Sequence, residues 1–368
     1  MAKEKKPMKV WQKILLVILI VVICIAALLA VLILILTVTE YKPKDEESLE
    51  VNGASSKEIS IGDDITAMTW NIGYGALGDN ADFFMDGGTS VRTADEDRVN
   101  ENVSGIIREI QSIDPDVAFL QEVDENSTRS HHINEAQTIS DSLSGYTNTY
   151  ASNYRVLWIP YPIPNIGKVD AGILSLTRYD IADSTRIQLP CPFSWPTRLG
   201  NLKRCLAVNR VKISGSDKEL VLVNLHLEAY DSGEGKKKQT AMLRDVLETE
   251  TAKGNYVIAA GDFNQTFSNV DNPYPVLDGM WEAGLIDISE FNDTLQFCMD
   301  DSTPSCRSLD RSLADAESTA PDDFQYYIID GFIVSNNITV HSVQTQDLEF
   351  KNSDHNPVVT TLTLNEEP

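Results

Sequence analysis

The feature that most constrains this chain is an uninterrupted apolar run of 23 residues, from Ile14 to Leu36. An α-helix rises about 1.5 Å per residue, so a helix over this run is long enough to cross a hydrocarbon core of about 30 Å. The sequence therefore predicts one transmembrane helix, over residues 14–38. Whatever else the chain folds into must be built from the residues that follow this helix.

Charges on the two sides of the run predict its orientation. Residues 1–13 carry five Lys and one Glu, whereas three consecutive acidic residues, 45–47, follow the run. The positive-inside rule then places this basic tail in the cytoplasm and the chain after residue 38 outside the cell membrane. A cleaved signal peptide is the alternative, because alanines lie within 26–30, but the apolar region of a signal peptide usually spans only about 7 to 15 residues.

The chain beyond the basic tail is strongly acidic. The whole chain has a formal net charge of −25, and without residues 1–13 it keeps 25 basic and 54 acidic side chains, a net charge of −29. This charge argues against a general nucleic-acid coat protein but does not exclude an enzyme that holds a few phosphates through a metal. Residues 39–64 lack an apolar period, which predicts a solvated stalk that keeps the following domain close to the bilayer.

The cysteines support export. One of the five, Cys24, lies within the apolar run, and the other four form an even set: Cys191, Cys205, Cys298 and Cys306. In an oxidising compartment such a set predicts two disulfides. Three pairings are possible, and the short-range choice joins residues 191 with 205 and 298 with 306. A zinc site is the alternative, but no C-x-x-C spacing supports it.

Residues 65–364 show a mixed α and β pattern without repeats. Short, β-branched apolar runs predict buried strands at 65–72, 117–123, 220–227, 256–260 and 328–334. Apolar residues at helical spacing predict one helix that ends near Asp114 and another over about 236–252. Because the strands outnumber the helices, the sequence predicts sheets in the middle with helices outside, an α+β fold.

Polar side chains stand at the ends of these predicted strands. They are Asn71, Glu122, His226, Asp262, Asn264, Asp330, Asp354 and His355. Buried carboxylates and amides cost free energy unless something compensates them. A single Asp or Asn at such a position is most often a turn residue, and a single His is most often simply hydrogen-bonded. So many polar residues at strand ends are harder to explain as turns.

Together these residues supply the ligands of a hard cation. Oxygen atoms of Glu, Asp and Asn suit Mg²⁺ or Mn²⁺, and Mg²⁺ in proteins typically binds one or two carboxylates together with phosphate oxygens of a substrate. A His beside a carboxylate can activate water or stabilise charge, and amide donors can hold a phosphoryl oxygen. The sequence therefore indicates phosphoester hydrolysis.

The ordered motifs WN, QE, NxH, GDxN, D and SDH closely resemble those of the endonuclease/exonuclease/phosphatase superfamily. This group includes deoxyribonucleases, apurinic endonucleases, bacterial sphingomyelinases and inositol polyphosphate 5-phosphatases. The resemblance covers residues 65–364 and implies a catalytic domain with a four-layered α/β sandwich, in which two mostly antiparallel sheets are flanked by helices. It also implies a metal-dependent phosphoric ester hydrolase that uses Mg²⁺ or Mn²⁺.

The resemblance implies a role for each motif residue. Glu122 would be the main metal ligand, with Asn71 and Asp354 assisting. His355 would be the catalytic histidine and Asp330 the carboxylate that orients it. The remaining three residues would act on water and phosphate, as follows: Asp262 would position or deprotonate the attacking water, Asn264 would contact the scissile phosphate, and His226 would be a second phosphate-contacting histidine.

The substrate is left open by the motifs. Residues 266–325 and the Pro-aromatic segment 158–164 match no part of the family pattern, and substrate choice is expected there. Aromatic residues in the loops near 158–161 and 193–195 suit either core packing or a membrane interface. Lipid head groups or small phosphoesters are ranked above nucleic acid, because the domain is acidic and close to the bilayer. A non-catalytic binding module is the alternative of another class, but it would show broken motifs.

Overall fold

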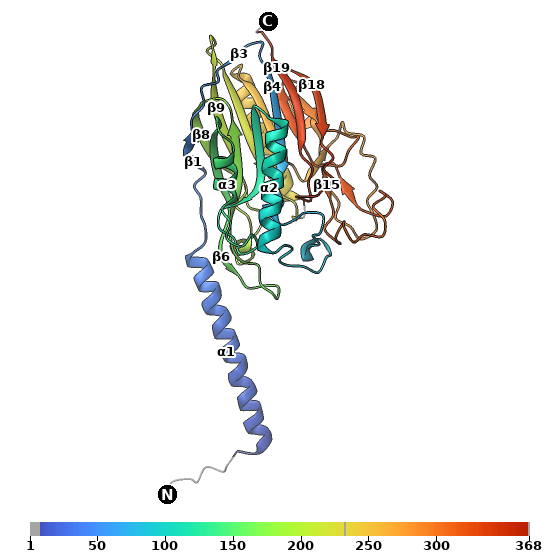
Figure 1. Ribbon diagram of the computed structural model, residues 1–368. Coiled ribbons are helices and arrows are strands. Elements are labelled where there is room, and N and C mark those ends of the chain that lie inside the picture. The colour runs from blue at the N-terminus through green and yellow to red at the C-terminus, as the bar shows by residue number, and fades with distance from the viewer. Residues whose placement is uncertain (1–7, 232, 367–368) are drawn as a thin grey trace.

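The structure, a computed structural model, describes residues 8–231 and 233–366 and shows a long N-terminal helix below a layered α/β domain (Figure 1). The helices are α1 (Val10–Val38), α2 (Glu96–Ile113), α3 (Glu135–Ser142) and α4 (Glu234–Ala252). Short 3₁₀ turns lie at Gly73–Gly75, Phe84–Asp86, Thr197–Gly200 and Ile288–Glu290. Most of the basic tail predicted to be cytoplasmic, residues 1–7, lies outside the described residues.

Two large sheets form the middle of the domain. The β11 sheet runs in the order β1 (Glu46–Ser48), β8 (Ile181–Gln188), β9 (Cys205–Ser214), β10 (Glu219–His226), β11 (Tyr256–Asp262), β17 (Asp330–Ser335), β14 (Leu295–Cys298), and β3 (Ile59–Ser60) pairs with β9. The β5 sheet runs in the order β18 (Ile338–Thr345), β19 (Val358–Leu364), β4 (Asp64–Asn71), β5 (Val117–Asp124), β7 (Gly167–Thr177), β6 (Thr147–Ile159), β2 (Val51–Gly53). Two small pairs complete the described strands, β12 (Gln265–Phe267) with β13 (Gly284–Ile286) and β15 (Cys306–Arg307) with β16 (Tyr326–Tyr327).

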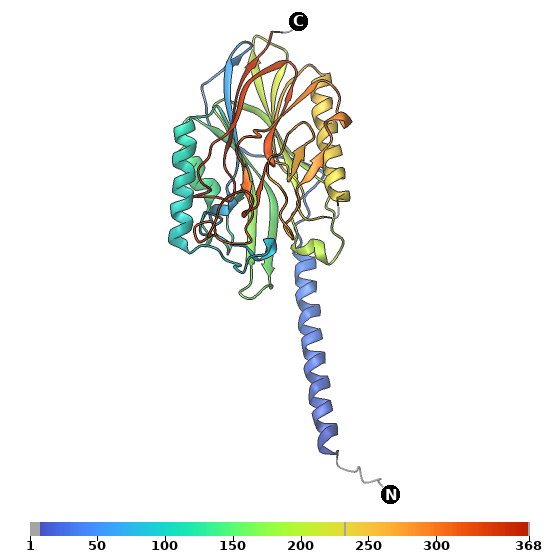
Figure 2. The same cartoon turned by 90° about the vertical axis from the view of Figure 1, so that its right-hand side faces the viewer.

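Three apolar cores hold four layers together. Residues such as Phe119, Leu222 and Phe332 fill the space between the two sheets. A second core packs α2 and α3 on the β5 sheet, and a third packs α4 on the β11 sheet. Figure 2 shows α2 and α4 on opposite outer faces of the sheets. The predicted α+β fold, a sandwich of two mostly antiparallel sheets flanked by helices, is confirmed.

Helix α1 is long and apolar enough to span a membrane, and none of its residues is buried against the domain. Its C-terminal end is nevertheless fixed to the domain. The indole nitrogen of Trp195 donates to the Thr37 hydroxyl at 3.1 Å, and the Arg198 guanidinium lies 3.1 Å from the Glu40 carboxylate.

Residues 39–64 differ from the solvated stalk that the sequence predicts. Within this segment β1 pairs with β8, β2 with β6, and β3 with β9, so part of it extends both sheets. These pairs are only two or three residues long, and such short pairings leave no apolar period in the sequence. The segment therefore joins α1 to the domain through backbone hydrogen bonds, not through a free coil.

The two predicted disulfides are wrong for this structure, because all five cysteines are free. Cys205 is buried in the β11 sheet, where its Sγ lies 3.9 Å from the carbonyl oxygen of Ser152. Cys306 is buried beside His355, to which it forms an isolated β-bridge. Even cysteine counts predict bridges only when the fold brings the sulfur atoms together, and here buried cysteines occupy sheet and site positions instead.

Candidate active site

Register across the β11 sheet brings three predicted site residues into one row. His226 ends β10 opposite Asp262, the last residue of β11, and Asp262 lies opposite Asp330, the first residue of β17. This row requires glycine at position 261, where φ is +159° and a Cβ atom would lie 1.9 Å from the carbonyl oxygen of Leu225. The absence of a side chain there allows β10 and β11 to approach closely beside the site.

The β5 sheet supplies the opposite wall. Asn71 ends β4 beside Gln121, and the next residue, Glu122, sits in a bulge of β5 with φ of +52°. A bulge redirects the side chain that it carries, and here it places Glu122 3.2 Å from the amide nitrogen of Asn71. Glycine is also required at position 73, where a Cβ atom would lie 2.9 Å from a carboxylate oxygen of Asp354.

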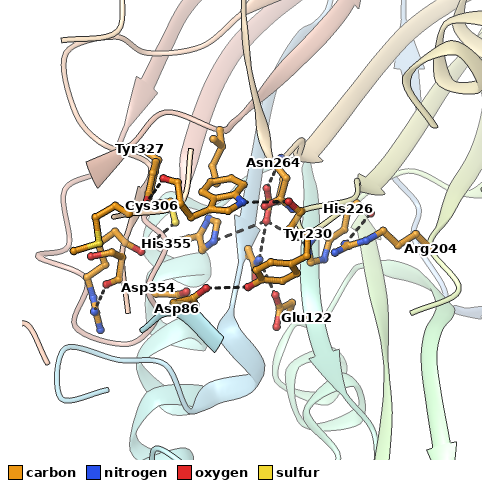
Figure 3. A pocket seen from close by; sticks show the side chains of 18 residues that line it. Asp86, Glu122, Arg204, His226, Tyr230, Asn264, Cys306, Tyr327, Asp354 and His355 are labelled. Carbon is orange, nitrogen blue, oxygen red and sulfur yellow. Dashed lines mark hydrogen bonds and ion pairs between the residues drawn. The ribbon is translucent and has the colours of Figure 1, made fainter. Parts of the chain in front are cut away.

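These walls enclose a cavity of about 100 Å³, here called the site cavity (Figure 3). Seven of the eight predicted site residues line it: Asn71, Glu122, His226, Asp262, Asn264, Asp354 and His355. The eighth, Asp330, is buried directly behind His355. The structure thus brings together every residue that the strand-end pattern selects.

His355 is held by a buried carboxylate. Its Nδ1 lies 2.8 Å from Oδ2 of Asp330, and the same oxygen accepts a hydrogen bond from the Ser305 hydroxyl at 2.8 Å. Burial by itself lowers the pKa of His355, but the Asp330 carboxylate outweighs burial and raises that pKa well above its ordinary value. The arrangement fixes the ring orientation and favours the charged imidazolium.

Asp262 lines the site cavity between the two histidines that approach its carboxylate. Its Oδ2 accepts a hydrogen bond from the Asn71 amide at 3.1 Å and lies 3.4 Å from Nε2 of His226 and 3.8 Å from Nε2 of His355. Burial, followed by the charge of Asp330, raises the pKa of Asp262 to about 7. A carboxylate with this pKa is suited to accept a proton near neutral pH.

His226 differs from His355 in charge. Burial and the nearby Arg204 lower the pKa of His226 well below its ordinary value, so this imidazole is neutral. Its Nδ1 has no hydrogen-bond partner among the described residues. Asn264 has a φ of +51°, and its backbone N–H donates to Oδ1 of Asp262 at 2.8 Å. Its side-chain amide donates to the carbonyl oxygen of Leu227 at 2.9 Å.

The predicted metal ligands fit a hard cation in charge and in donor type. Burial and the charge of Glu122 raise the pKa of Asp354 to about 6. Within the described part of the chain, neither Asp354 nor Asp262 forms a salt bridge with a Lys or an Arg. Carboxylates that face one cavity raise one another's pKa, and a divalent ion bound by their oxygens would supply positive charge that favours their ionised form.

The site cavity also contains residues that the strand-end pattern does not select. The Tyr230 hydroxyl donates to Asp86 at 3.0 Å (Figure 3). Arg204 also lines the cavity and pairs with Glu228 at 3.3 Å. Trp281, Cys306 and Arg307 also line the cavity. These side chains come from loops, a 3₁₀ turn and a two-residue strand, where no periodic signal marks them in the sequence.

Arg129 lies near the site and is largely, but not fully, buried. It binds the Asp124 carboxylate through two nitrogens, at 3.1 and 2.9 Å, and approaches Glu122 to 4.0 Å. Its guanidinium stacks 3.6 Å from the ring centroid of Tyr74. The neighbouring His131 instead contacts the carbonyl of Ala94, at 2.9 Å.

A four-layered sandwich whose two sheets meet at an acidic, histidine-containing cavity defines a class of proteins that are usually hydrolases acting on phosphoester bonds. The chain belongs to the endonuclease/exonuclease/phosphatase family, whose family model matches residues 68–355. The resemblance inferred from the motifs is therefore confirmed. No curated protein sequence matches the chain.

Solved structures share the fold. The crystal structure of an endonuclease/exonuclease/phosphatase from Beutenbergia cavernae is 22% identical, with a TM-score of 0.56, over 83% of this chain and 72% of that one. The human Nocturnin catalytic domain with a bound sulfate anion is 20% identical, with a TM-score of 0.50, over 86% and 98%. A protein of the same family from Bacteroides vulgatus is 18% identical, with a TM-score of 0.50, over 82% and 100%.

Proposed function

We propose that this protein is a membrane-anchored, outward-facing phosphoesterase that depends on Mg²⁺ or Mn²⁺. The observation that carries the proposal is the convergence of both sheets on one cavity, where Asp262 lies within 4 Å of both His226 and His355. A structural cluster of turn residues has no need for a buried carboxylate behind one of its histidines. Family membership supports the same reaction class.

The chain's own residues divide the reaction among them. Asp262 orients the attacking water and accepts its proton as the water oxygen bonds to phosphorus and the bond to the leaving oxygen breaks. Neutral His226 and the amide of Asn264 donate hydrogen bonds to a phosphoryl oxygen. The His355 imidazolium, held by Asp330, stabilises the negative charge that grows in the transition state. Each role uses the protonation state that its surroundings favour.

Glu122, with Asn71 and Asp354, would hold the metal ion. When bound, the ion supplies positive charge beside the phosphate and so lowers the cost of placing an anionic substrate among carboxylates. The Arg129 guanidinium, 4.0 Å from Glu122, supports the orientation of that carboxylate from the far side.

The proposed membrane orientation rests on the lysines of residues 1–13, before the apolar run. Protease added to intact cells is expected to remove the domain after residue 38 and to spare the N-terminal tail, because positive charge retains the tail in the cytoplasm. Immunoblots against tags at the two ends measure both products. A domain that stays protected until the cells are permeabilised would show that the orientation is the opposite one.

The preferred substrate is a phosphoester at the membrane, such as a phospholipid head group, ahead of DNA or RNA. The chain after residue 13 has a net charge of −29, which repels a long polyanion, and α1 is joined directly to the domain. Local basic residues act only over a Debye length of about 8 to 10 Å. Turnover on phospholipid vesicles is therefore expected to exceed turnover on plasmid DNA at equal enzyme. Nicking of plasmid without release of head group or phosphate from vesicles would establish a nuclease instead.

A further inference from the structure

An uncharged apolar loop joins β6 and β7. No charged residue lies between Arg155 and Lys168, although the chain after residue 13 carries 79 charged side chains. Two of the loop's apolar side chains are largely exposed, Tyr161 at 72% and Ile163 at 94%. Leu157 and Trp158 are exposed beside them, at 52% and 39%. These four residues are here called the hairpin tip. Soluble surfaces rarely present such a contiguous apolar group unless it contacts another phase or partner.

The hairpin tip lies at the same end of the domain as α1. In Figures 1 and 2, two views turned about the vertical axis, the loop below β6 reaches past the C-terminal end of α1, toward the level of the helix itself. The exposed Trp195, hydrogen-bonded to Thr37, marks the level at which α1 leaves the domain. A bilayer spanned by α1 would therefore meet the hairpin tip at its outer interface.

A second, largely apolar cavity of about 400 Å³ connects this region with the site. Tyr161, Ile159 and Ile166 of the β6–β7 hairpin line one part of it, together with Phe83 and Met85. Glu122, His226 and Asp354 line both this apolar cavity and the site cavity. An apolar chamber that opens onto metal-binding carboxylates accommodates a molecule with an apolar part and a phosphate.

We infer that the hairpin tip docks into the outer leaflet, and that the apolar cavity receives the hydrocarbon part of a bilayer phospholipid whose phosphate reaches the site cavity. Tyr and Trp favour the head-group region, and burial of Leu157 and Ile163 removes apolar area from water. The second half of this inference, concerning the phospholipid, rests on the proposed function. The first half, the docking, rests on the placement and composition of the hairpin tip alone.

Docking is tested by fluorescence quenching with the full-length protein in phosphatidylcholine nanodiscs whose acyl chains carry bromine. Wild-type tryptophan emission is expected to be quenched relative to unbrominated nanodiscs, and Trp158→Phe is expected to remove part of the quenched emission. Trp281→Phe is the matched control, because Trp281 lines the site cavity and its removal should leave the quenched part unchanged. Equal quenching in wild type and Trp158→Phe would overturn the docking.

Hydrolysis tests the delivery of lipid. The double variant Leu157→Ser, Ile163→Ser is expected to lose about tenfold or more of its turnover on phosphatidylcholine nanodiscs, because it removes two exposed apolar side chains that docking would bury in the bilayer. Turnover of the water-soluble diester bis(p-nitrophenyl) phosphate should stay unchanged. The control variant Val276→Ser, Leu285→Ser removes two exposed apolar side chains outside the hairpin and should keep both activities.

The outcomes separate the two ideas. Equal activity of the hairpin variant and the control on nanodiscs would overturn delivery of lipid by the hairpin tip. Absence of hydrolysis on every substrate, with quenching as expected, would refute the proposed function and leave the docking supported. Hydrolysis of the soluble diester alone by the wild type would support the phosphoesterase and overturn the phospholipid as its substrate.

Discussion

Replacement of His355 by Ala is expected to lower phosphoester hydrolysis by on the order of 10²-fold or more, and adding Asp330→Asn to that variant should cost little further. The reason is geometric: Asp330 contacts His355 Nδ1 at 2.8 Å and acts on the reaction through that ring. Asp330→Asn alone should lose a similar factor. Initial rates of the three variants on one substrate measure this double-mutant cycle.

A matched control is His341→Ala, since His341 is exposed and contacts only the Thr363 hydroxyl among its described hydrogen bonds. Its activity should equal that of the wild type. Losses that add up in the double variant would show that Asp330 and His355 act separately. A fall in melting temperature that accompanies the loss in Asp330→Asn would assign that carboxylate a structural role instead.

Glu122→Gln is expected to raise the Mg²⁺ concentration needed for half-maximal rate by on the order of tenfold or more, because the variant removes the charged ligand and keeps its shape. Rates measured over a metal titration give this shift. Glu125→Gln is the control, because Glu125 is partly exposed and pairs with Arg155 at 3.8 Å, outside the site cavity. An unchanged metal requirement in Glu122→Gln would remove this residue from the ligand set.

The site residues could be predicted because they lie at the ends of strands that the sequence pattern also predicts. A short apolar run followed by a polar residue, as at Asn71 or Asp262, marks a strand and its end in one signal. Five predicted strands correspond to β4, β5, β10, β11 and β17. Their register, which places His226, Asp262 and Asp330 in one row, is set by pairing across the sheet and is not visible in any local pattern.

Other features depend on contacts that the sequence does not record. β1 and β2 form on the free edges of β8 and β6, and β3 pairs with the end of β9 that extends beyond β8, so their own residues show no period. The Tyr230–Asp86 hydrogen bond joins residues 144 positions apart. The even number of cysteines after the apolar run predicts disulfides, but all of them are free, and Cys205 and Cys306 are buried in different surroundings. In each case the tertiary fold determines which residues come into contact, and the local sequence or the composition does not predict that contact.

The most direct test of the central claim is the rate of bis(p-nitrophenyl) phosphate hydrolysis by the full-length protein before chelation, in EDTA, and after Mg²⁺ or Mn²⁺ is restored. Activity is expected to vanish in EDTA and to return with either ion, because the carboxylates of Glu122 and Asp354 offer oxygen ligands that suit a hard cation. His355→Ala should stay inactive after the metal returns. Full activity in the chelator would contradict the account.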